Sequence, residues 1–281
     1  MENSPKPDLF SPAEMASIAS ENGTKKTKLP VIPMFLLAIQ AGAFIAFGAL
    51  LCIVVGTNTL GTWPYGIARI LMGFVFCLGL ILIVVGGGEL FTGNSLLIIP
   101  FMQKKFSLGR LLRNWFWVYL GNFAGSCLIA LLFVLARTYA SAQGDVGRMM
   151  LNTAITKVNL DFGTAIVSGV LCNMLVCLAV WLTYSGRSTI DKIVAILFPI
   201  TAFVAAGFEH SVANMFFIPS ALFLKSINPA FVATLGIDVS SLTWGNFLLH
   251  NLLPVSLGNI LGGAGWIGLM VWRIFLRDNT K

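Results

Sequence analysis

Six long apolar stretches constrain the fold of this chain more than any other feature of its sequence. They lie near 33–56, 66–101, 114–136, 161–184, 193–224 and 245–274. Each is long enough for the roughly 20 residues that a helix needs to cross a bilayer. The composition agrees, since 57% of residues are hydrophobic, 10% are charged and the mean hydropathy is +0.87. We therefore predict an all-α polytopic membrane protein with six transmembrane helices.

Two of these stretches are interrupted by polar residues. The fifth contains Gly207-Phe208-Glu209-His210-Ser211-Val212-Ala213-Asn214-Met215, and the second contains Gly86-Gly87-Gly88-Glu89-Leu90-Phe91-Thr92-Gly93-Asn94. An ionisable side chain is costly at membrane depth and indicates a functional site. Irregular backbone persists there only where it is buried in protein or lines a cavity. The sequence therefore predicts that helices 2 and 5 are broken.

The two halves of the chain also match each other. The third stretch carries Leu120-Gly121-Asn122 with Gly125, and the sixth carries Leu257-Gly258-Asn259 with Gly262 and Gly263. Small residues four apart allow close helix packing in lipid. Because each half holds three spans, the second copy must be inverted, which brings the two breaks together near the midplane. Two inverted three-helix repeats with a pore between them follow from this pattern.

The charged residues predict the topology and the domain organisation. With the N-terminus inside, most of the 18 Lys and Arg residues fall in inner segments, so both termini are expected to be cytoplasmic. The net charge of +7 is not gathered into a nucleic-acid-binding face. We expect a cytoplasmic segment over 1–30, a channel domain over 31–276 and a cytoplasmic tail over 277–281. Ser11 and Pro12 predict the start of a short helix in the first segment, ending at about Ser20.

With these features in view, the sequence resembles the formate/nitrite transporter family, and most of all its formate channel branch. The likeness covers roughly 10 to 276. It is carried by Leu90-Phe91-Thr92, Tyr184-Ser185-Gly186-Arg187-Ser188 with Asp191-Lys192, the run Gly207 to Met215, Met174 to Trp181 and Gly258-Asn259. The resemblance implies an aquaporin-like fold, a homopentamer with a pore through each protomer, and passage of small monovalent anions.

The resemblance also assigns roles to individual residues. His210 matches the central pore histidine, Thr92 the threonine that faces it, and Asn259 the asparagine that hydrogen-bonds nearby. Lys157 matches the basic residue that draws anions to the outer vestibule. Glu209, beside His210, is expected mainly to hold the broken loop. The remaining assignments form two constrictions, an outer one of Phe76, Phe203 and Asn173 and an inner one of Leu80, Phe91 and Val176.

These assignments predict pH-sensitive transport of formate, as the anion or together with a proton, across the bacterial inner membrane. Imidazole has an unperturbed pKa near ~6.5, so His210 is a suitable proton partner for the anion. Nitrite and hydrosulfide are similar in size and charge, so a nitrite or hydrosulfide channel of the same family is the alternative. Membrane lipid is the surrounding medium, and nucleic acid is not an expected partner.

Other classes of membrane protein fit the sequence less well. An enzyme is not expected, because Glu209-His210 has no second histidine at metal spacing and no cofactor loop is present. The five cysteines lie in apolar runs without metal spacing, so neither a metal nor a cofactor is predicted. A water channel of the aquaporin type would carry paired Asn-Pro-Ala boxes at the breaks. A scaffold without transport would not need ionisable residues at both of them.

Overall fold

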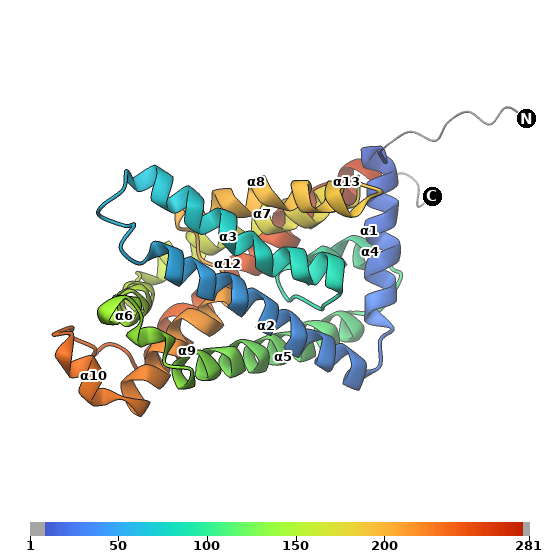
Figure 1. Ribbon diagram of the computed structural model, residues 1–281. Helices are drawn as coiled ribbons and strands as arrows, with labels where there is room; N and C mark the ends of the chain where they lie inside the picture. Colours follow the sequence, from blue (N-terminus) through green and yellow to red (C-terminus); the bar gives the residue numbers. More distant parts are fainter. Residues whose placement is uncertain (1–8, 278–281) are drawn as a thin grey trace, which may run out of the picture.

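The computed structural model describes residues 9–277, which are almost entirely helical (Figure 1). Residues 1–8 of the predicted first segment, and the predicted tail 277–281 apart from Arg277, lie outside this range. Within it, six helices are long and apolar enough to cross a membrane. They are α2 (Val31–Gly56), α3 (Tyr65–Gly86), α5 (Leu108–Leu135), α7 (Phe162–Thr183), α8 (Thr189–Ala206) and a 32-residue helix over Trp244–Phe275. The predicted six-span architecture is confirmed.

The second and fifth spans are broken, as predicted. After α3, non-helical backbone leads to η1 (Gly93–Leu97) and α4 (Ile98–Met102), and after α8 it leads to α9 (Ser211–Ile227). Each first half-helix ends at a glycine with positive φ, +90° at Gly87 and +79° at Gly207. Side chains with a Cβ atom rarely adopt this conformation, so glycine sets both break points.

The sixth span is continuous but changes its winding along its length. It consists of α11 (Trp244–Asn246), η4 (Phe247–Leu252), α12 (Leu253–Ile260), η5 (Leu261–Gly268) and α13 (Leu269–Phe275). Both η4 and η5 are π-helical. Wide turns of this kind inside α-helices are frequent at functional sites. Here they lie on both sides of α12, which carries Asn259.

Glycines bring the spans of each half into close contact. In the first half α2 packs against α5, and a Cβ added to Gly125 would overlap the carbonyl oxygen of Ile39. In the second half α7 packs against α12 and η5, and a Cβ on Gly262 would overlap the carbonyl oxygen of Val170. The predicted small-residue faces are therefore true helix contacts, repeated in both halves.

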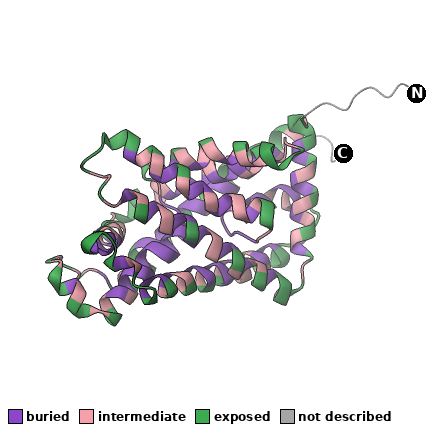
Figure 2. Ribbon diagram, viewed as in Figure 1, coloured by how far each residue is buried: buried purple, intermediate pink, exposed green. Residues whose placement is uncertain are grey.

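Helices outside the six spans lie at both ends of the bundle. α1 (Pro12–Thr27) runs across one end, and α6 (Asp145–Val158) and α10 (Pro229–Thr234) lie at the other (Figure 1). α13 packs against α1, so the described chain begins and ends on the same side. Buried residues gather between the spans, and exposed ones follow their outward faces (Figure 2). Apolar outward residues such as Ile32 and Phe198 give that surface the character that lipid requires.

α1 is longer than the sequence predicts. It begins at the expected place, with Pro12 as its first residue and a capping box formed by Ser11 and Glu14. It continues to Thr27 instead of ending near Ser20. Gly23 does not end the helix, because its missing side chain makes room for the Pro100 ring; an added Cβ would lie 2.8 Å from Pro100 Cγ. Docking against α4 therefore offsets the low helix propensity of glycine.

Candidate transport pathway

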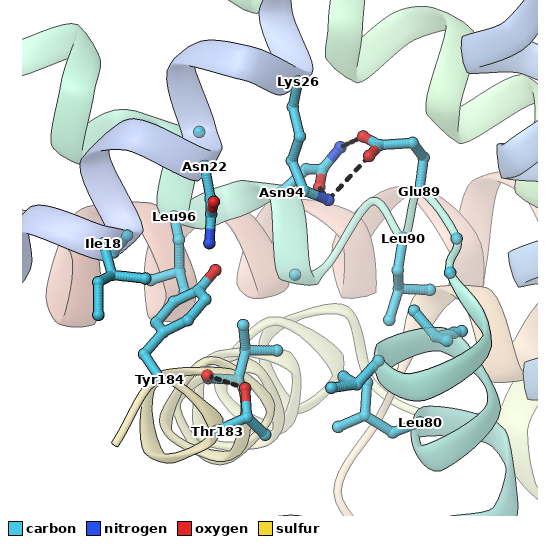
Figure 3. A pocket seen from close by; sticks show the side chains of 18 of the residues that line it. Ile18, Asn22, Lys26, Leu80, Glu89, Leu90, Asn94, Leu96, Thr183 and Tyr184 are labelled. Atoms are coloured by element: carbon cyan, nitrogen blue, oxygen red, sulfur yellow. Dashed lines mark hydrogen bonds and ion pairs between the residues drawn. The ribbon is translucent and has the colours of Figure 1, made fainter. Parts of the chain in front are cut away.

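Two cavities enter the molecule from opposite ends. The one beside α1, which we call the α1 cavity, has a volume of about 560 Å³ (Figure 3). Its lining comes mainly from α1, the C-terminal ends of α3 and α7, the first break and the start of α8. The residues used below are Lys25, Lys26, Leu80, Glu89, Leu90, Gly93, Asn94 and Lys192.

The second cavity lies beside α6, and we call it the α6 cavity. Its volume is about 400 Å³, and its lining comes from α3, α6, the end of α8 and the second break. The residues used below are Tyr65, Arg69, Phe76, Lys157, Phe203, Gly207, Glu209, His210 and Asn214. Among the described residues, the two cavities share no lining residue.

The two breaks meet between these cavities through a contact of His210 with Thr92. His210 Nε2 lies 2.9 Å from Thr92 Oγ1, and both residues are buried, with 2% and 0% of their surface exposed. His210 lines the α6 cavity, whereas Leu90 and Gly93, on either side of Thr92, line the α1 cavity. The contact is therefore part of the barrier that separates the two cavities.

The position of His210 at the start of α9 fixes the form of its ring. Its Nδ1 accepts a hydrogen bond of 3.0 Å from the N–H of Ala213, so the imidazole acts as the N-cap of α9. A nitrogen that accepts carries no proton, so the neutral ring has its hydrogen on Nε2 and donates it to Thr92 Oγ1. The hydroxyl hydrogen of Thr92 remains able to donate to a third group.

Aromatic and aliphatic side chains surround this contact. The Phe203 ring stacks on that of His210 at 5.8 Å and meets Phe76 edge-on at 5.5 Å. Phe76 lines the α6 cavity, while Leu80, one turn further along α3, lines the α1 cavity. Four helical residues span about 6 Å, so the apolar barrier beside α3 is about one helical turn thick.

A charged cluster holds the second break on the α6 side. Lys157 Nζ forms an ion pair of 2.7 Å with Glu209 Oε1. Asn214 donates its Nδ2 hydrogens to Glu209 Oε2 at 2.6 Å and to Asn251 Oδ1 at 2.8 Å. The Glu209 carboxylate is therefore paired and hydrogen-bonded, which is what a buried charge requires.

The first break carries an equivalent cluster, made of other residues, on the α1 side. Lys26 Nζ lies 2.9 Å from Glu89 Oε1 and donates to Asn94 Oδ1 at 2.9 Å (Figure 3). Asn94 donates to Glu89 Oε2 at 2.7 Å and to Asn114 Oδ1 at 2.9 Å. Lys26 comes from the helix before α2 and Lys157 from the helix before α7, so the repeat extends to α1 and α6.

One further asparagine fastens each break to the scaffold. Asn259 Oδ1 accepts from the N–H of Ser211 at 2.9 Å, and its Nδ2 donates to the carbonyl oxygens of Glu209 and Gly169. Asn122 does the same in the first half, binding the N–H of Phe91 and the carbonyl oxygens of Glu89 and Ala38. The bonds to Ser211, Glu209, Phe91 and Glu89 satisfy backbone groups of the breaks, and those to Gly169 and Ala38 attach the two asparagines to α7 and α2.

Three of the residues assigned to constrictions lie outside both cavity linings. Asn173 is buried next to Thr92. It donates to the carbonyl oxygen of Asn259 at 2.6 Å and to that of Thr92 at 3.3 Å. Phe91 packs its ring against Tyr119 at 4.7 Å, and Val176 is buried in the core. Leu90, not Phe91, lines the α1 cavity.

Several residues of these clusters are absent from the sequence-based assignments, although their spacing is regular. Glutamate and asparagine are five apart in both breaks, at Glu89 and Asn94 and at Glu209 and Asn214. The asparagine pairs of spans 3 and 6 are both eight apart, at 114 and 122 and at 251 and 259. Each paired lysine comes five residues before the next helix. Comparing these spacings between the halves would have identified the α1-side cluster.

The geometry defines the class of protein. Within residues 9–277, no three His, Cys, Asp or Glu side chains are grouped to hold a metal ion. What the fold does provide is two cavities from opposite ends, separated by a thin apolar barrier with polar groups at its centre. An inverted-repeat membrane protein of this kind is a channel or a transporter.

Comparison with known proteins identifies the family. A family model described as "Formate/nitrite transporter" matches residues 13–273. The chain is 43% identical over 276 residues to "Formate channel FocA" of Escherichia coli (strain K12), covering 97% of this chain and 96% of the relative. It is 36% identical over 283 residues to a "Probable formate transporter" of Methanothermobacter thermautotrophicus, covering 95% and 98%. The chain belongs to the formate/nitrite transporter family.

Solved structures support the fold. A chain described as "Pentameric formate channel with formate bound" superimposes with a TM-score of 0.82 at 39% identity, covering 88% of this chain and 98% of that one. An "FNT family ion channel" superimposes with a TM-score of 0.80 at 27% identity, covering 92% and 98%. The aquaporin-like arrangement of six spans that the resemblance implied is therefore confirmed at the level of the family.

Proposed function

We propose that this protein is a pH-sensitive formate channel of the bacterial cytoplasmic membrane. Formate passes between the α1 cavity and the α6 cavity of each protomer, crossing the barrier at His210 and Thr92. The observation that carries the proposal is the buried 2.9 Å contact between these two side chains, at the meeting point of the two breaks. The names of the relatives and of the solved channel support formate as the anion.

Charges at both entrances favour an anion over a cation. Lys25, Lys26 and Lys192 line the α1 cavity together with one carboxylate, Glu89. Arg69 and Lys157 line the α6 cavity together with one carboxylate, that of Glu209. Positive side chains in a cleft with low-dielectric walls raise the local concentration of anions. The narrow apolar barrier then excludes water and cations.

At the barrier, hydrogen-bond donors replace part of the hydration that formate loses. The Thr92 hydroxyl, which accepts from His210 Nε2, can donate its own hydrogen to a carboxylate oxygen. For His210 to deliver a proton, its ring must first gain one on Nδ1, and this breaks the capping bond from Ala213. Proton delivery is therefore tied to the N-terminus of α9. In this scheme formate crosses as the anion at neutral pH and with a proton at acidic pH.

The proposed orientation puts α1 and the C-terminal end of the sixth span on the cytoplasmic side. The α1 end of the molecule carries most of the basic residues, among them Lys104, Lys105, Arg110 and Arg113 in the connection before α5 and in its first turns. Basic residues concentrate on the cytoplasmic side of membrane proteins. By analogy with the pentameric solved channel, five copies assemble, each with its own pore and with its apolar outer faces against lipid or a neighbouring copy.

The test is uptake by proteoliposomes that contain the full chain, offered formate, nitrite and hydrosulfide separately at one acidic and one neutral pH. We expect formate to enter fastest, with a flux that changes between the two pH values. Faster entry of nitrite or hydrosulfide would contradict formate as the substrate and reassign the channel to that anion. Equal flux with empty liposomes would contradict transport altogether.

A further inference from the structure

The positive charges in the α6 cavity are not equivalent. The Lys157 ammonium lies 2.7 Å from the Glu209 carboxylate, and their side chains are 15% and 6% exposed. Opposite charges at this distance form a dipole, whose attraction for an anion falls off much faster with distance than that of a single charge. The Lys157–Glu209 pair therefore contributes little to the long-range field of the cavity.

Arg69 carries the other positive charge, and its contacts leave that charge intact. It projects from the first turns of α3, where its Nε donates to the carbonyl oxygen of Ala205 at 3.1 Å and its Nη2 donates to that of Val204. The guanidinium carbon lies 6.0 Å from the centre of the Tyr65 ring. Carbonyl groups and an aromatic ring are uncharged, so Arg69 keeps its full positive charge.

The helix break explains why these carbonyl groups are available. α8 ends at Ala206, so the carbonyl oxygens of its last turn lack the helical N–H partners four residues further on, and that of Val204 accepts only the capping N–H of Gly207, at 3.1 Å, from the described backbone. The C-terminus of a helix carries roughly half a negative charge, which would repel an anion approaching the barrier. Gly207 lets Arg69 come close, since a Cβ there would lie 3.2 Å from Nη2.

We propose that Arg69 is the residue that determines anion attraction in the α6 cavity. Among the described residues that line this cavity, it supplies the one positive charge that no carboxylate neutralises, and it offsets the negative end of α8 beside the barrier. This inference rests on the proposed anion transport and adds the residue that sets how readily the anion is captured. The charged groups that face the cavity are Arg69, Lys157 and Glu209.

Two substitutions separate the charge of Arg69 from its hydrogen bonds. Arg69→Gln keeps an amide donor for the carbonyl oxygens but removes the charge. Arg69→Lys keeps the charge but loses the planar guanidinium that donates to two carbonyl oxygens at once. Arg148→Gln is the matched control. Arg148 lies on α6, donates to the carbonyl oxygen of Leu235 at the end of α10, and does not line the cavity.

The measurement is formate flux at neutral pH in proteoliposomes, with formate added on the α6 side, as a function of formate concentration at low and high ionic strength. For Arg69→Gln we expect the half-saturating concentration to rise roughly tenfold at low ionic strength. The difference should shrink in about 1 M inert salt, where the screening length is only about 3 Å. Arg69→Lys and Arg148→Gln should stay within about twofold of the unmodified protein.

Equal half-saturation in Arg69→Gln and the unmodified protein would overturn the inference. An equally large defect in Arg69→Lys, insensitive to salt, would also overturn it, because helix capping and not charge would then be the role of Arg69. Elution of each variant as the same oligomer shows that it folds. Failure of the unmodified protein to pass formate contradicts the proposed function separately, and the series is then run with the anion that does cross.

Discussion

In the first helix break Glu89 binds Lys26 and Asn94, and in the second Glu209 binds Lys157 and Asn214. When the sequences of the two breaks are aligned on Glu89 and Glu209, the other residues of the breaks pair without gaps. The backbone N–H two residues later is bound by an asparagine of span 3 in one half and of span 6 in the other. The chain has therefore kept the same polar scaffold in both inverted copies.

The same alignment shows where the copies differ. His210 occupies the position of Leu90, and Thr92 occupies the position of Val212. His210 and Thr92 are hydrogen-bonded to each other at the barrier. The repeated residues hold the two breaks in place, and in the proposed function His210 and Thr92, which are not repeated, act on the anion at the centre of the pathway.

The strongest test of the shared scaffold is to remove its asparagines. Asn122→Leu and Asn259→Leu each leave one buried N–H and two buried carbonyl groups without these bonds. We expect each to lower the free energy of unfolding by about 3–9 kcal/mol, at roughly 1–3 kcal/mol per group. Thermal unfolding of the purified oligomer measures the loss.

The exposed Asn159 is the control, since Asn159→Leu should change stability by only about 0.5 kcal/mol. A large loss for one buried asparagine and none for the other would contradict the equivalence of the two breaks.

The two ion pairs should differ in strength, because their lysines differ in exposure. The Lys157 side chain is 15% exposed and that of Lys26 is 30% exposed. Glu209→Gln leaves the more buried Lys157 without its carboxylate partner and should lower the free energy of unfolding by about 3 kcal/mol. Glu89→Gln leaves the more exposed Lys26 without its partner and should lower it by about 1 kcal/mol. Denaturant unfolding of the two variants gives the comparison.

A double variant, Lys157→Gln with Glu209→Gln, leaves no unpaired charge and should recover much of the loss. If it is no more stable than Glu209→Gln alone, then the stranded lysine is not the cause.

The smallest expected difference concerns the two break glycines. Gly87 has φ +90° and ψ +132°, a region that is almost restricted to glycine, whereas Gly207 lies in the left-handed helical region with φ +79° and ψ +24°. Gly87→Ala should therefore cost about 2 kcal/mol and Gly207→Ala about 1 kcal/mol. Equal losses on thermal unfolding would show that backbone strain does not distinguish the breaks.

Much of the fold can be predicted from the sequence because the bilayer restricts what each segment can do. Apolar length predicts the spans, and a carboxylate inside such a run predicts each break. The path beyond the breaks is less predictable. α6 (Asp145–Val158) is too short to be recognised as a span by apolar length, although its buried residues Val146, Met150, Leu151, Ala154 and Val158 follow a helical spacing that would have predicted the helix carrying Lys157.

The sequence indicates His210 as a candidate site residue, because an ionisable side chain is costly inside an apolar run. A site residue is harder to predict where its place in the site depends on the direction in which its side chain points. Leu90 and Phe91 are adjacent apolar residues of the same non-helical segment, and only the backbone conformation decides that Leu90 points into the α1 cavity while Phe91 packs on Tyr119. The role proposed for Arg69 is also hard to predict, because it depends on contact with the end of α8, which is far away in the sequence.

The central claim is that the two breaks form a common scaffold and that His210 adds the pH-dependent step. The most direct test is formate flux through His210→Asn at acidic and neutral pH, beside the unmodified protein. Asparagine at this position can still accept the capping bond from Ala213, so α9 should begin as before, but its amide cannot take up a proton in this pH range. We predict that the variant still passes formate and that its flux no longer changes with pH. A pH dependence equal to that of the unmodified protein would contradict the account.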